Sequence, residues 1–308
     1  MPGTVLDAIG NTPIAELCKV APPGCARIVA KLEWGNPTGG MKDRMARAAI
    51  DAAERDGRLP PGGTVVEATM GTTGISLALV CAAKGYGLHI VFSDAFSDEK
   101  RRTMQAFGAT VEDIPSDEGR ITEALVKAML ARAHELAAKP RHWWCDQLRN
   151  RDAINGYLAM GEEIWTQTGG RVDAFVHSVS TGHSILGAAR ALREHKPDLH
   201  VAAVEPAESA VLSGRPSGSH KIEGIGIGFV PPLWEPDAVD EVIAVTTEDA
   251  KAMTRRLAVE EGLLAGASSG ANVAAAIRLG QRLGPDATVA TILVDSGLRY
   301  LSTSVFRP

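Results

Sequence analysis

Short apolar runs alternate with amphipathic segments along most of this chain. Continuous runs rich in Val, Ile and Leu predict buried strands at residues 64–67, 88–92, 109–114, 172–177, 199–204 and 288–294, with shorter candidates at 143–146 and 243–245. Apolar residues at helical spacing predict helices at residues 73–84, 98–107, 120–138, 153–166, 184–195, 247–261 and 270–283. This order of strand, helix and strand is typical of parallel sheets covered by helices, so we predict an α/β fold.

Glycine and proline interrupt the pattern at two places. Gly156 weakens the predicted helix 153–166, because glycine costs a helix interior about 1 kcal/mol relative to alanine. Residues 213–232 contain five glycines and three prolines and show no periodic pattern. This segment is either a linker or a functional loop, and long loops inside compact domains are more often functional.

The composition is that of an ordinary globular protein. The 308 residues suffice for about two domains. A net charge of −5, from 32 basic and 37 acidic residues, indicates no surface for nucleic acid or an anionic membrane. The four cysteines form no Cys-x-x-C pair, so neither a metal site nor a disulfide framework is expected. The N-terminal residues predict no secretory signal, and a cytoplasmic location is expected.

Two loops rich in Gly, Thr and Ser follow predicted strands and lead into predicted helices. They are residues 69–74 (Thr-Met-Gly-Thr-Thr-Gly) and residues 180–184 (Ser-Thr-Gly-His-Ser). In open α/β sheets, ligands bind beyond the carboxyl ends of strands, where helix N-termini offer N–H groups to phosphate or carboxylate. Neither loop matches a dinucleotide or nucleoside-triphosphate motif, and a single such loop is often only a structural turn. The pair of loops favours an anion site.

Lys42 is the second chemical feature. It lies where the loop of residues 36–41 enters a helix that ends near Gly57. A lysine at a helix start is unfavourable for the helix dipole, which lowers its pKa and keeps a neutral amine available for Schiff-base chemistry. The alternative is a solvated surface lysine, the commoner state of this residue type.

Several motifs in one order give the chain a family resemblance. They lie at residues 10–14, 36–37, 42–44, 69–74, 205–206, 220–231, 268–271 and 299–303. Through them the chain resembles the cysteine synthase family. These are β-replacing pyridoxal-phosphate enzymes of fold type II, a group that includes the catalytic core of cystathionine β-synthase. The resemblance extends over about residues 9–306. It implies a tryptophan synthase β-like fold: a smaller mobile domain of residues 44–147 with the substrate-carboxylate loop, and a larger domain of residues 1–43 plus 148–308 with the cofactor contacts.

The resemblance also implies residue roles. Lys42 matches the catalytic lysine that carries the cofactor, pyridoxal 5′-phosphate, as a Schiff base. The implied cofactor-binding residues are Lys42, Thr72, Ser180, Thr181, Gly182, His183, Ser184 and Ser268, of which 180–184 surround the phosphate and Ser268 contacts the pyridine nitrogen. The implied substrate-binding residues are Thr69, Met70, Gly71, Thr73, Gln147 and Gly224. A serine at the pyridine nitrogen does not keep it protonated, which favours loss of a β-leaving group over transamination.

The chain departs from the family pattern at several of these positions. Met70 and Thr72 replace a serine and an asparagine in the carboxylate loop, and Ser180 and His183 replace glycines in the phosphate loop. Gly40 replaces a serine, and residues 148–152 lack the family's Asn-Pro repeats. The changes gather on the substrate side, so the cofactor chemistry is expected to persist while substrate identity is open. His183 is either an acid/base group or a packing residue.

The resemblance implies β-replacement on an O-activated L-serine such as O-acetyl-L-serine. An aminoacrylate forms, and sulfide or another small nucleophile adds to give L-cysteine or a related β-substituted alanine. The alternatives are β-elimination, dehydration or racemisation of a small amino acid, and a non-catalytic binding protein. The dehydratase motif Ser-Phe-Lys-x-Arg does not match Met41–Arg44, and the intact Lys42 and Ser268 argue against a non-catalytic protein. The implied partners are a second copy of the chain in a homodimer and a serine acetyltransferase.

Overall fold

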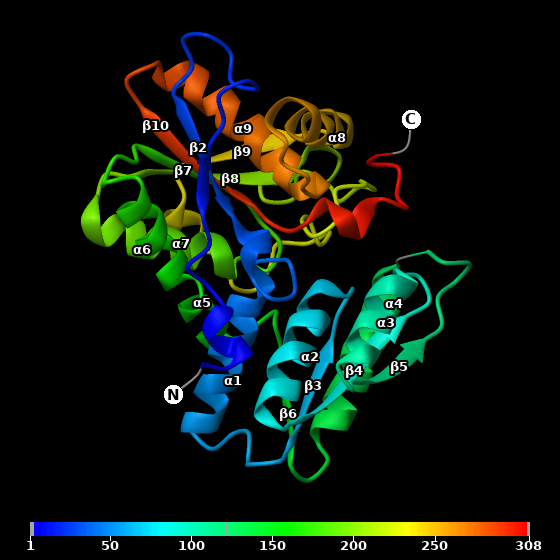
Figure 1. Ribbon diagram of the computed structural model, residues 1–308. Helices are drawn as coiled ribbons and strands as arrows, with labels where there is room; N and C mark the ends of the chain where they lie inside the picture. The colour runs from blue at the N-terminus through cyan, green and yellow to red at the C-terminus, as the bar shows by residue number, and fades with distance from the viewer. Residues whose placement is uncertain (1–2, 121, 307–308) are drawn as a thin grey trace. The chain divides into compact units, whose positions relative to one another are not determined.

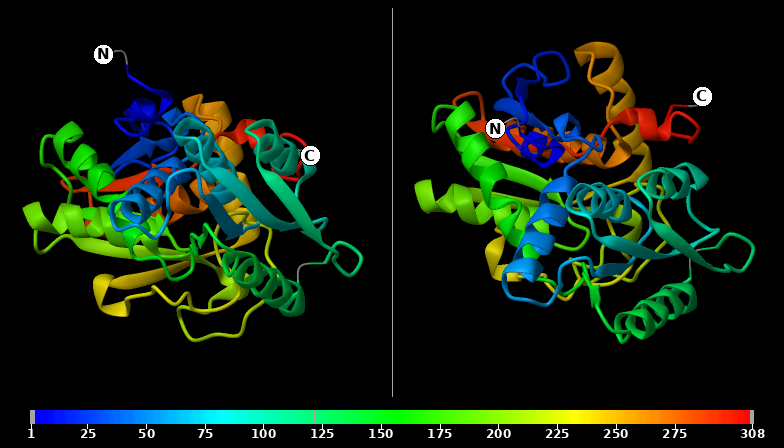
Figure 2. Two further views of the ribbon diagram at one scale, coloured as in Figure 1. Left: turned by 90° about the horizontal axis from the view of Figure 1, so that it is seen from below. Right: turned by 60° about the horizontal axis from the view of Figure 1, so that its bottom comes forward.

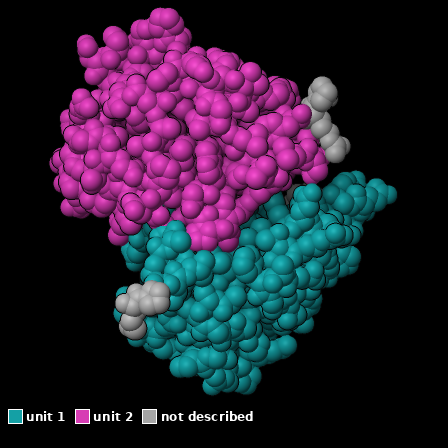
Figure 3. Space-filling model, in the orientation of Figure 1, with its two compact units in different colours: residues 1–9, 42–156 teal, residues 10–41, 157–308 magenta. Residues whose placement is uncertain are grey.

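Two separate sheets of mostly parallel strands organise the chain, one in each of two units (Figure 1). The computed structural model describes residues 3–120 and 122–306. Unit 1 comprises residues 3–9 and 42–156, and unit 2 comprises residues 10–41 and 157–306 (Figure 3). The predicted α/β fold, with two mostly parallel sheets flanked by helices, is confirmed.

Unit 1 is built on a four-stranded parallel sheet of order β5-β4-β3-β6. Its strands are β3 (Thr64–Ala68), β4 (Gly87–Ser93), β5 (Thr110–Ile114) and β6 (His142–Trp144). Its helices are η1 (Val5–Ala8), α1 (Lys42–Arg55), α2 (Thr72–Lys84), α3 (Asp98–Ala106), α4 (Glu123–Ala137) and α5 (Asp152–Asn155). The crossovers through α2, α3 and α4 keep the strands parallel.

Helices cover both faces of this sheet. Val66, Ala68 and Val91 pack against Leu125 and Met129 of α4. Side chains alternate along a strand, so Val65 points to the opposite face, where α2 packs with α1 and α3 beside it. Figure 2 shows α4 on one side of the sheet and α2 and α3 on the other. The sheet is therefore buried on both faces, which explains its continuous apolar runs.

Unit 2 is built on a six-stranded sheet of order β1-β2-β10-β7-β8-β9. Its strands are β1 (Ile14–Glu16), β2 (Arg27–Leu32), β7 (Ala174–Ser178), β8 (His200–Pro206), β9 (Glu241–Val245) and β10 (Thr288–Leu293), and among these only β1 is antiparallel to its neighbour. Its helices are α6 (Leu158–Gln167), α7 (His183–His195), α8 (Thr247–Arg256) and α9 (Ala267–Leu283). Its short helical turns are η2 (Glu33–Gly35), η3 (Ala207–Ser209), η4 (Pro236–Ala238), η5 (Leu257–Glu261) and η6 (Gly297–Tyr300).

The main core of unit 2 lies between its sheet and the pair α8–α9. Ile28, Val176 and Val204 from three strands pack there with Val273 and Ile277 of α9. Helices α6 and α7 lie on the other face (Figure 1). The loops that follow β7 and precede α9 are thus anchored to a rigid sheet.

Two buried charges hold the N-terminal segment of unit 2. The Lys31 ammonium donates to the Thr12 carbonyl oxygen at 2.5 Å and pairs with Glu163 at 2.7 Å. The Glu33 carboxylate accepts from the Thr12 hydroxyl at 2.7 Å and from the Asn36 amide at 3.0 Å. The motifs at residues 10–14 and 36–37 therefore serve the local structure of unit 2.

The predicted elements differ from the structure in a few places. The helix expected at 153–166 is two helices that are separated at Gly156 and Tyr157, and Gly156 packs so closely on α1 that an added Cβ would lie 2.3 Å from the Arg44 carbonyl oxygen. The helix expected at 247–261 ends as a π-helical turn, η5, before Gly262. The helix expected at 120–138 begins at Glu123, and residue 121 lies outside the described residues. Neither β1 nor β2 was predicted.

Residues 213–232 contain no helix or strand, as their glycines and prolines predict. Residues 3–9, which the sequence division placed with the larger domain, contact unit 1, where Arg47 donates to the Leu6 carbonyl oxygen at 2.5 Å. In the part of the chain that the structure describes, every helix is too short or too polar to cross a membrane.

Candidate active site

Lys42 is the first residue of α1 and begins the second segment of unit 1. Its side chain is only 9% exposed. No hydrogen bond or ion pair joins its amine to another described residue. Burial without a partner disfavours the ammonium form and lowers the pKa of Lys42 to about 8. In the structure, burial lowers the pKa of Lys42. The sequence had predicted a lowered pKa from the position of Lys42 at the start of a helix.

The loop of residues 69–74 ends at the start of α2. Gly71 caps this helix with φ 130°, a conformation that favours glycine, and no side chain caps it. The Gly71 N–H donates to the Thr69 hydroxyl at 3.0 Å, which closes the turn. The first N–H groups of α2, beginning with Thr72, are left without an intrahelical partner. Met70 is 45% exposed at the tip of the loop.

Gln147 is fixed beside the same helix start. Its side-chain oxygen accepts from the Thr73 hydroxyl at 2.7 Å, and its amide nitrogen donates to the Ala68 carbonyl oxygen at 3.1 Å. These two bonds set the orientation of the amide and leave its second N–H hydrogen as a donor. The remaining Gln147 N–H and the first N–H groups of α2 together form a group of donors suited to a carboxylate.

A buried carboxyl lies behind this group of donors. Glu67, at 1% exposure, accepts from the backbone N–H groups of Ala68 at 2.9 Å and Gln147 at 3.1 Å. Burial raises the pKa of Glu67 to about 8, and the two N–H donors oppose this shift. Glu67 thus ties the segment of Gln147 to the end of β3. Sequence reasoning missed it, although an acidic residue inside a predicted buried strand was a visible signal.

The loop of residues 180–184 ends at the start of α7 in unit 2. Gly182 caps this helix with φ 95°, and again no side chain caps it. Thr181 and Ser184 are buried there, and Ser180 is half-buried. The start of a helix without a side-chain cap, together with these hydroxyls, is chemically suited to a phosphate group.

Two buried histidines contact the hydroxyls of this loop. His177 Nε2 lies 2.8 Å from Ser184 Oγ, and His183 Nδ1 lies 2.8 Å from Thr181 Oγ1. Both imidazoles are at most 1% exposed. His183 therefore packs within the loop, one of the two alternatives left open by the sequence. His177 was missed, because it ends a predicted strand and reads as a core position.

Ser268 lies in the first turn of α9, at 2% exposure. Among the described residues, none hydrogen-bonds its hydroxyl. The next residue, Ser269, is used structurally, since its hydroxyl accepts from the Val294 N–H at 2.8 Å. A buried hydroxyl without a protein partner fits contact with a polar ligand atom such as a pyridine nitrogen.

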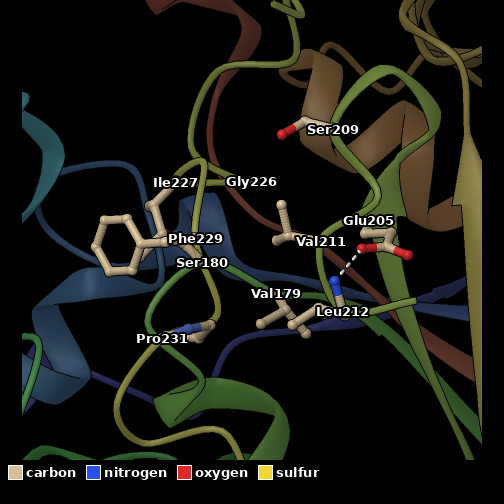
Figure 4. Close-up of a pocket in the computed structure, with 10 residues that line it drawn as sticks. All are labelled: Val179, Ser180, Glu205, Ser209, Val211, Leu212, Gly226, Ile227, Phe229 and Pro231. Carbon is tan, nitrogen blue, oxygen red and sulfur yellow. Dashed lines mark hydrogen bonds between the residues drawn. The ribbon is translucent and has the colours of Figure 1, made fainter. Parts of the chain in front are cut away.

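The glycine-rich segment of unit 2 lies against the phosphate loop. The Gly226 N–H donates to the Val179 carbonyl oxygen at 3.0 Å, and both residues line a small pocket with Ser180 and Phe229 (Figure 4). On the far side of the pocket, Glu205 accepts from the Leu212 N–H at 2.8 Å. Glu205 thus holds the loop after β8 in place.

The structure groups the predicted site residues within each unit. Unit 1 holds Lys42 and brings the loop of residues 69–74 together with Gln147. Unit 2 contains the loop of residues 180–184, Ser268 and Gly224, which is exposed with φ 90°.

Comparisons with known proteins agree with this arrangement. Residues 5–295 match the family model described as pyridoxal-phosphate dependent enzyme. A cysteine synthase from Staphylococcus aureus is 39% identical over 304 residues, covering 98% of this chain and 96% of the relative. The structure of O-acetyl serine sulfhydrylase isoform 3 from Entamoeba histolytica superposes with a TM-score of 0.93 at 36% identity, covering 100% of this chain and 92% of that chain. The structure of an O-acetylserine dependent cystathionine β-synthase from Helicobacter pylori superposes with a TM-score of 0.91 at 35% identity. The match covers 100% of this chain and 99% of that chain.

Proposed function

Because the chain belongs to the family of pyridoxal-phosphate dependent enzymes, within its cysteine synthase group, we propose that it catalyses β-replacement on an O-activated L-serine. The substrate is an O-activated serine such as O-acetyl-L-serine, and the incoming nucleophile is sulfide or another small nucleophile. The product is L-cysteine or a related β-substituted alanine. The observation that carries this proposal is the buried, unpaired amine of Lys42 with its lowered pKa.

The donors of this chain fit the cofactor. Lys42 would hold it covalently through its ε-amine, which must be neutral to react with an aldehyde. The start of α7, with Thr181 and Ser184, would bind its phosphate, and Ser268 would contact its pyridine nitrogen. When bound, pyridoxal phosphate supplies an electron-withdrawing ring that stabilises negative charge at the substrate α-carbon.

The remaining steps belong to residues of unit 1. The first N–H groups of α2 and the Gln147 amide would bind the substrate carboxylate and fix the orientation of the α-carbon. Lys42 Nζ, neutral above about pH 8, would accept the α-proton as general base and later return it. Met70 offers no hydroxyl to the carboxylate, so its N–H alone can donate there.

The test is a pair of assays on the purified enzyme loaded with pyridoxal phosphate. O-acetyl-L-serine with sulfide should yield L-cysteine faster than L-serine yields pyruvate. Lys42→Ala should abolish both this turnover and the visible absorbance of the bound cofactor, whereas Lys139→Ala, at an exposed lysine, should change neither. A fully active Lys42→Ala enzyme would refute the proposal, and faster pyruvate release from serine would favour the elimination reaction.

The nucleophile can be larger than sulfide. The Helicobacter pylori relative carries the name of a cystathionine β-synthase, so the same scaffold accepts a thiol larger than sulfide. The replacements Met70 and Thr72 stand in the loop assigned to the substrate. We therefore include homocysteine beside sulfide in the assay. A homodimer, a cytoplasmic location and docking of a serine acetyltransferase stay predictions.

A further inference from the structure

A chain of buried polar groups runs behind the phosphate loop of unit 2. It begins at Asn272 on α9, passes through His177 at the end of β7, and ends at Ser184 in the first turn of α7. Asn272 and His177 are fully buried and Ser184 is 7% exposed. Some atoms in this row of hydrogen bonds can only donate and others can only accept. These atoms determine where the hydrogens lie on the remaining groups.

The orientation of the Asn272 amide is fixed by two backbone groups. Its oxygen lies 2.8 Å from the Ser178 backbone nitrogen, which can only donate. Its nitrogen lies 2.8 Å from the Ile292 carbonyl oxygen, which can only accept. A flipped amide would oppose donor to donor and acceptor to acceptor, so the side chain has a single orientation.

This orientation sets the tautomer of His177. The amide nitrogen of Asn272 also lies 3.1 Å from His177 Nδ1. Since that nitrogen carries only hydrogens, Nδ1 must accept and is unprotonated. The imidazole is then neutral and carries its hydrogen on Nε2, as the partner of one ring nitrogen decides where the proton lies.

The tautomer in turn sets the direction of the Ser184 hydroxyl. His177 Nε2–H donates to Ser184 Oγ at 2.8 Å. The hydroxyl accepts this bond, and its own hydrogen cannot point back to the imidazole. We propose that Asn272 and His177 are positioning residues that keep the Ser184 hydroxyl as a donor to the phosphate group of the cofactor. This inference rests on the proposed function, since it concerns how that cofactor is held.

We call the hydrogen-bonded series Asn272, His177 and Ser184 the relay. Without it, Ser184 could rotate its hydroxyl hydrogen toward any neighbouring acceptor. Fixing the donor direction in the protein removes that freedom before the ligand binds, which is the advantage of a preorganised site. The bond to a charged acceptor is also among the stronger hydrogen bonds of proteins. Losing it should weaken phosphate binding about ten- to a hundred-fold.

The first test locates the hydrogens directly. Neutron diffraction from deuterium-exchanged crystals of the wild-type enzyme with bound pyridoxal phosphate should place deuterium on His177 Nε2 and none on Nδ1. The Ser184 deuterium should point to a phosphate oxygen. Deuterium on Nδ1, or a Ser184 deuterium directed at His177, would overturn the inference without any variant having to fold.

The second test is a double-mutant cycle on cofactor affinity. His177→Leu and Ser184→Ala should each raise the dissociation constant of pyridoxal phosphate about ten-fold or more, since each removes or misdirects one charge-assisted hydrogen bond. Combining them should add little, because His177 acts through Ser184. His177→Gln, which keeps an N–H donor, should restore part of the affinity.

Pyridoxal, which lacks the phosphate, is the matched probe. Its dissociation constant should be the same in the wild type and in all four variants, which also shows that they are folded. Equal weakening of pyridoxal and pyridoxal phosphate, or additive effects in the cycle, would overturn the inference. If the wild type binds neither compound, the proposed function itself fails, and the two failures are thereby distinguished.

Discussion

At the residue scale, burial changes the acid–base behaviour of single groups. Lys42 and Glu67 are both almost fully buried in unit 1, and burial moves their pKa values in opposite directions, each to about 8. The neutral form is favoured in both cases, because a low-dielectric surrounding disfavours charge of either sign. The amine therefore becomes more available as a base near neutral pH.

The lowered pKa of Lys42 predicts how stability depends on pH in the cofactor-free protein. The folded state loses the Lys42 proton near pH 8, whereas the unfolded chain keeps it up to the ordinary lysine pKa of 10.5. Between these values the unfolded state binds more protons, so the contribution of Lys42 to stability should rise with pH by about 3 kcal/mol and be constant below pH 8.

Urea unfolding of the wild type and of Lys42→Met between pH 7 and 10.5 measures this effect. The wild type should gain stability relative to Lys42→Met as the pH rises. Lys139→Met, at an exposed lysine, should stay parallel to the wild type. If the stability of Lys42→Met also changes with pH in parallel with that of the wild type, the Lys42 amine titrates at the ordinary lysine pKa.

At the element scale, strand predictions succeeded where burial is uniform. The cores of β3, β4, β7, β8 and β10 are continuous apolar runs, which predicted them directly. Strand β2 was missed because Lys31 interrupts its apolar run, although that lysine is fully buried through its partners. Strand β1 has only three residues, too few for a pattern.

Gly156, between α5 and α6, packs against α1 through a contact that the local sequence does not reveal. A Cβ on Gly156 would lie 2.3 Å from the Arg44 carbonyl oxygen and 2.6 Å from its carbon. Gly156→Ala should therefore destabilise the protein by about 1–3 kcal/mol, because backbone atoms of α1 must move.

Chemical denaturation of Gly156→Ala beside Asn155→Ala checks this. Asn155 is the preceding residue and is exposed, so its substitution should change the free energy of unfolding by less than about 0.5 kcal/mol. Equal stability of the two variants would mean that the helices separate freely at this contact.

At the scale of the whole molecule, the predicted site residues come from both units. The sequence predicted the loops of residues 69–74 and 180–184 from their places between strands and helices and from the family motifs. The orientation of their hydrogen-bond donors comes from the structure. The relay through Asn272 and His177 was beyond prediction, since it joins residues 95 positions apart that only folding brings together. Glu67 likewise acts on Gln147 across 80 positions.

Long-range charge pairing also ties together distant parts of unit 2. Lys31 connects β2 to the loop at Thr12 and to Glu163 of α6. Lys31→Met should lower the free energy of unfolding by about 3 kcal/mol, because it removes a fully buried ammonium that bonds the Thr12 carbonyl oxygen, Gln167 and the partly buried Glu163 carboxylate.

The comparison variant is Lys127→Met, which removes an exposed ion pair with Glu123. The Lys127 side chain is 74% exposed. That change should cost at most about 0.5 kcal/mol. Urea unfolding distinguishes the two, and a loss of stability in Lys31→Met no larger than in Lys127→Met would contradict the structural role of the buried ammonium.

The two helix starts capped by Gly71 and Gly182 have a consequence for how such an enzyme diversifies. Main-chain N–H groups at such helix starts can bind an anion without help from a capping side chain. We therefore expect that positions 70 and 72 can be varied while the first N–H groups of α2 stay available to an anion. A combinatorial library at these two sites, built on an otherwise unchanged scaffold, is thus a rational route to biocatalysts that make unnatural amino acids.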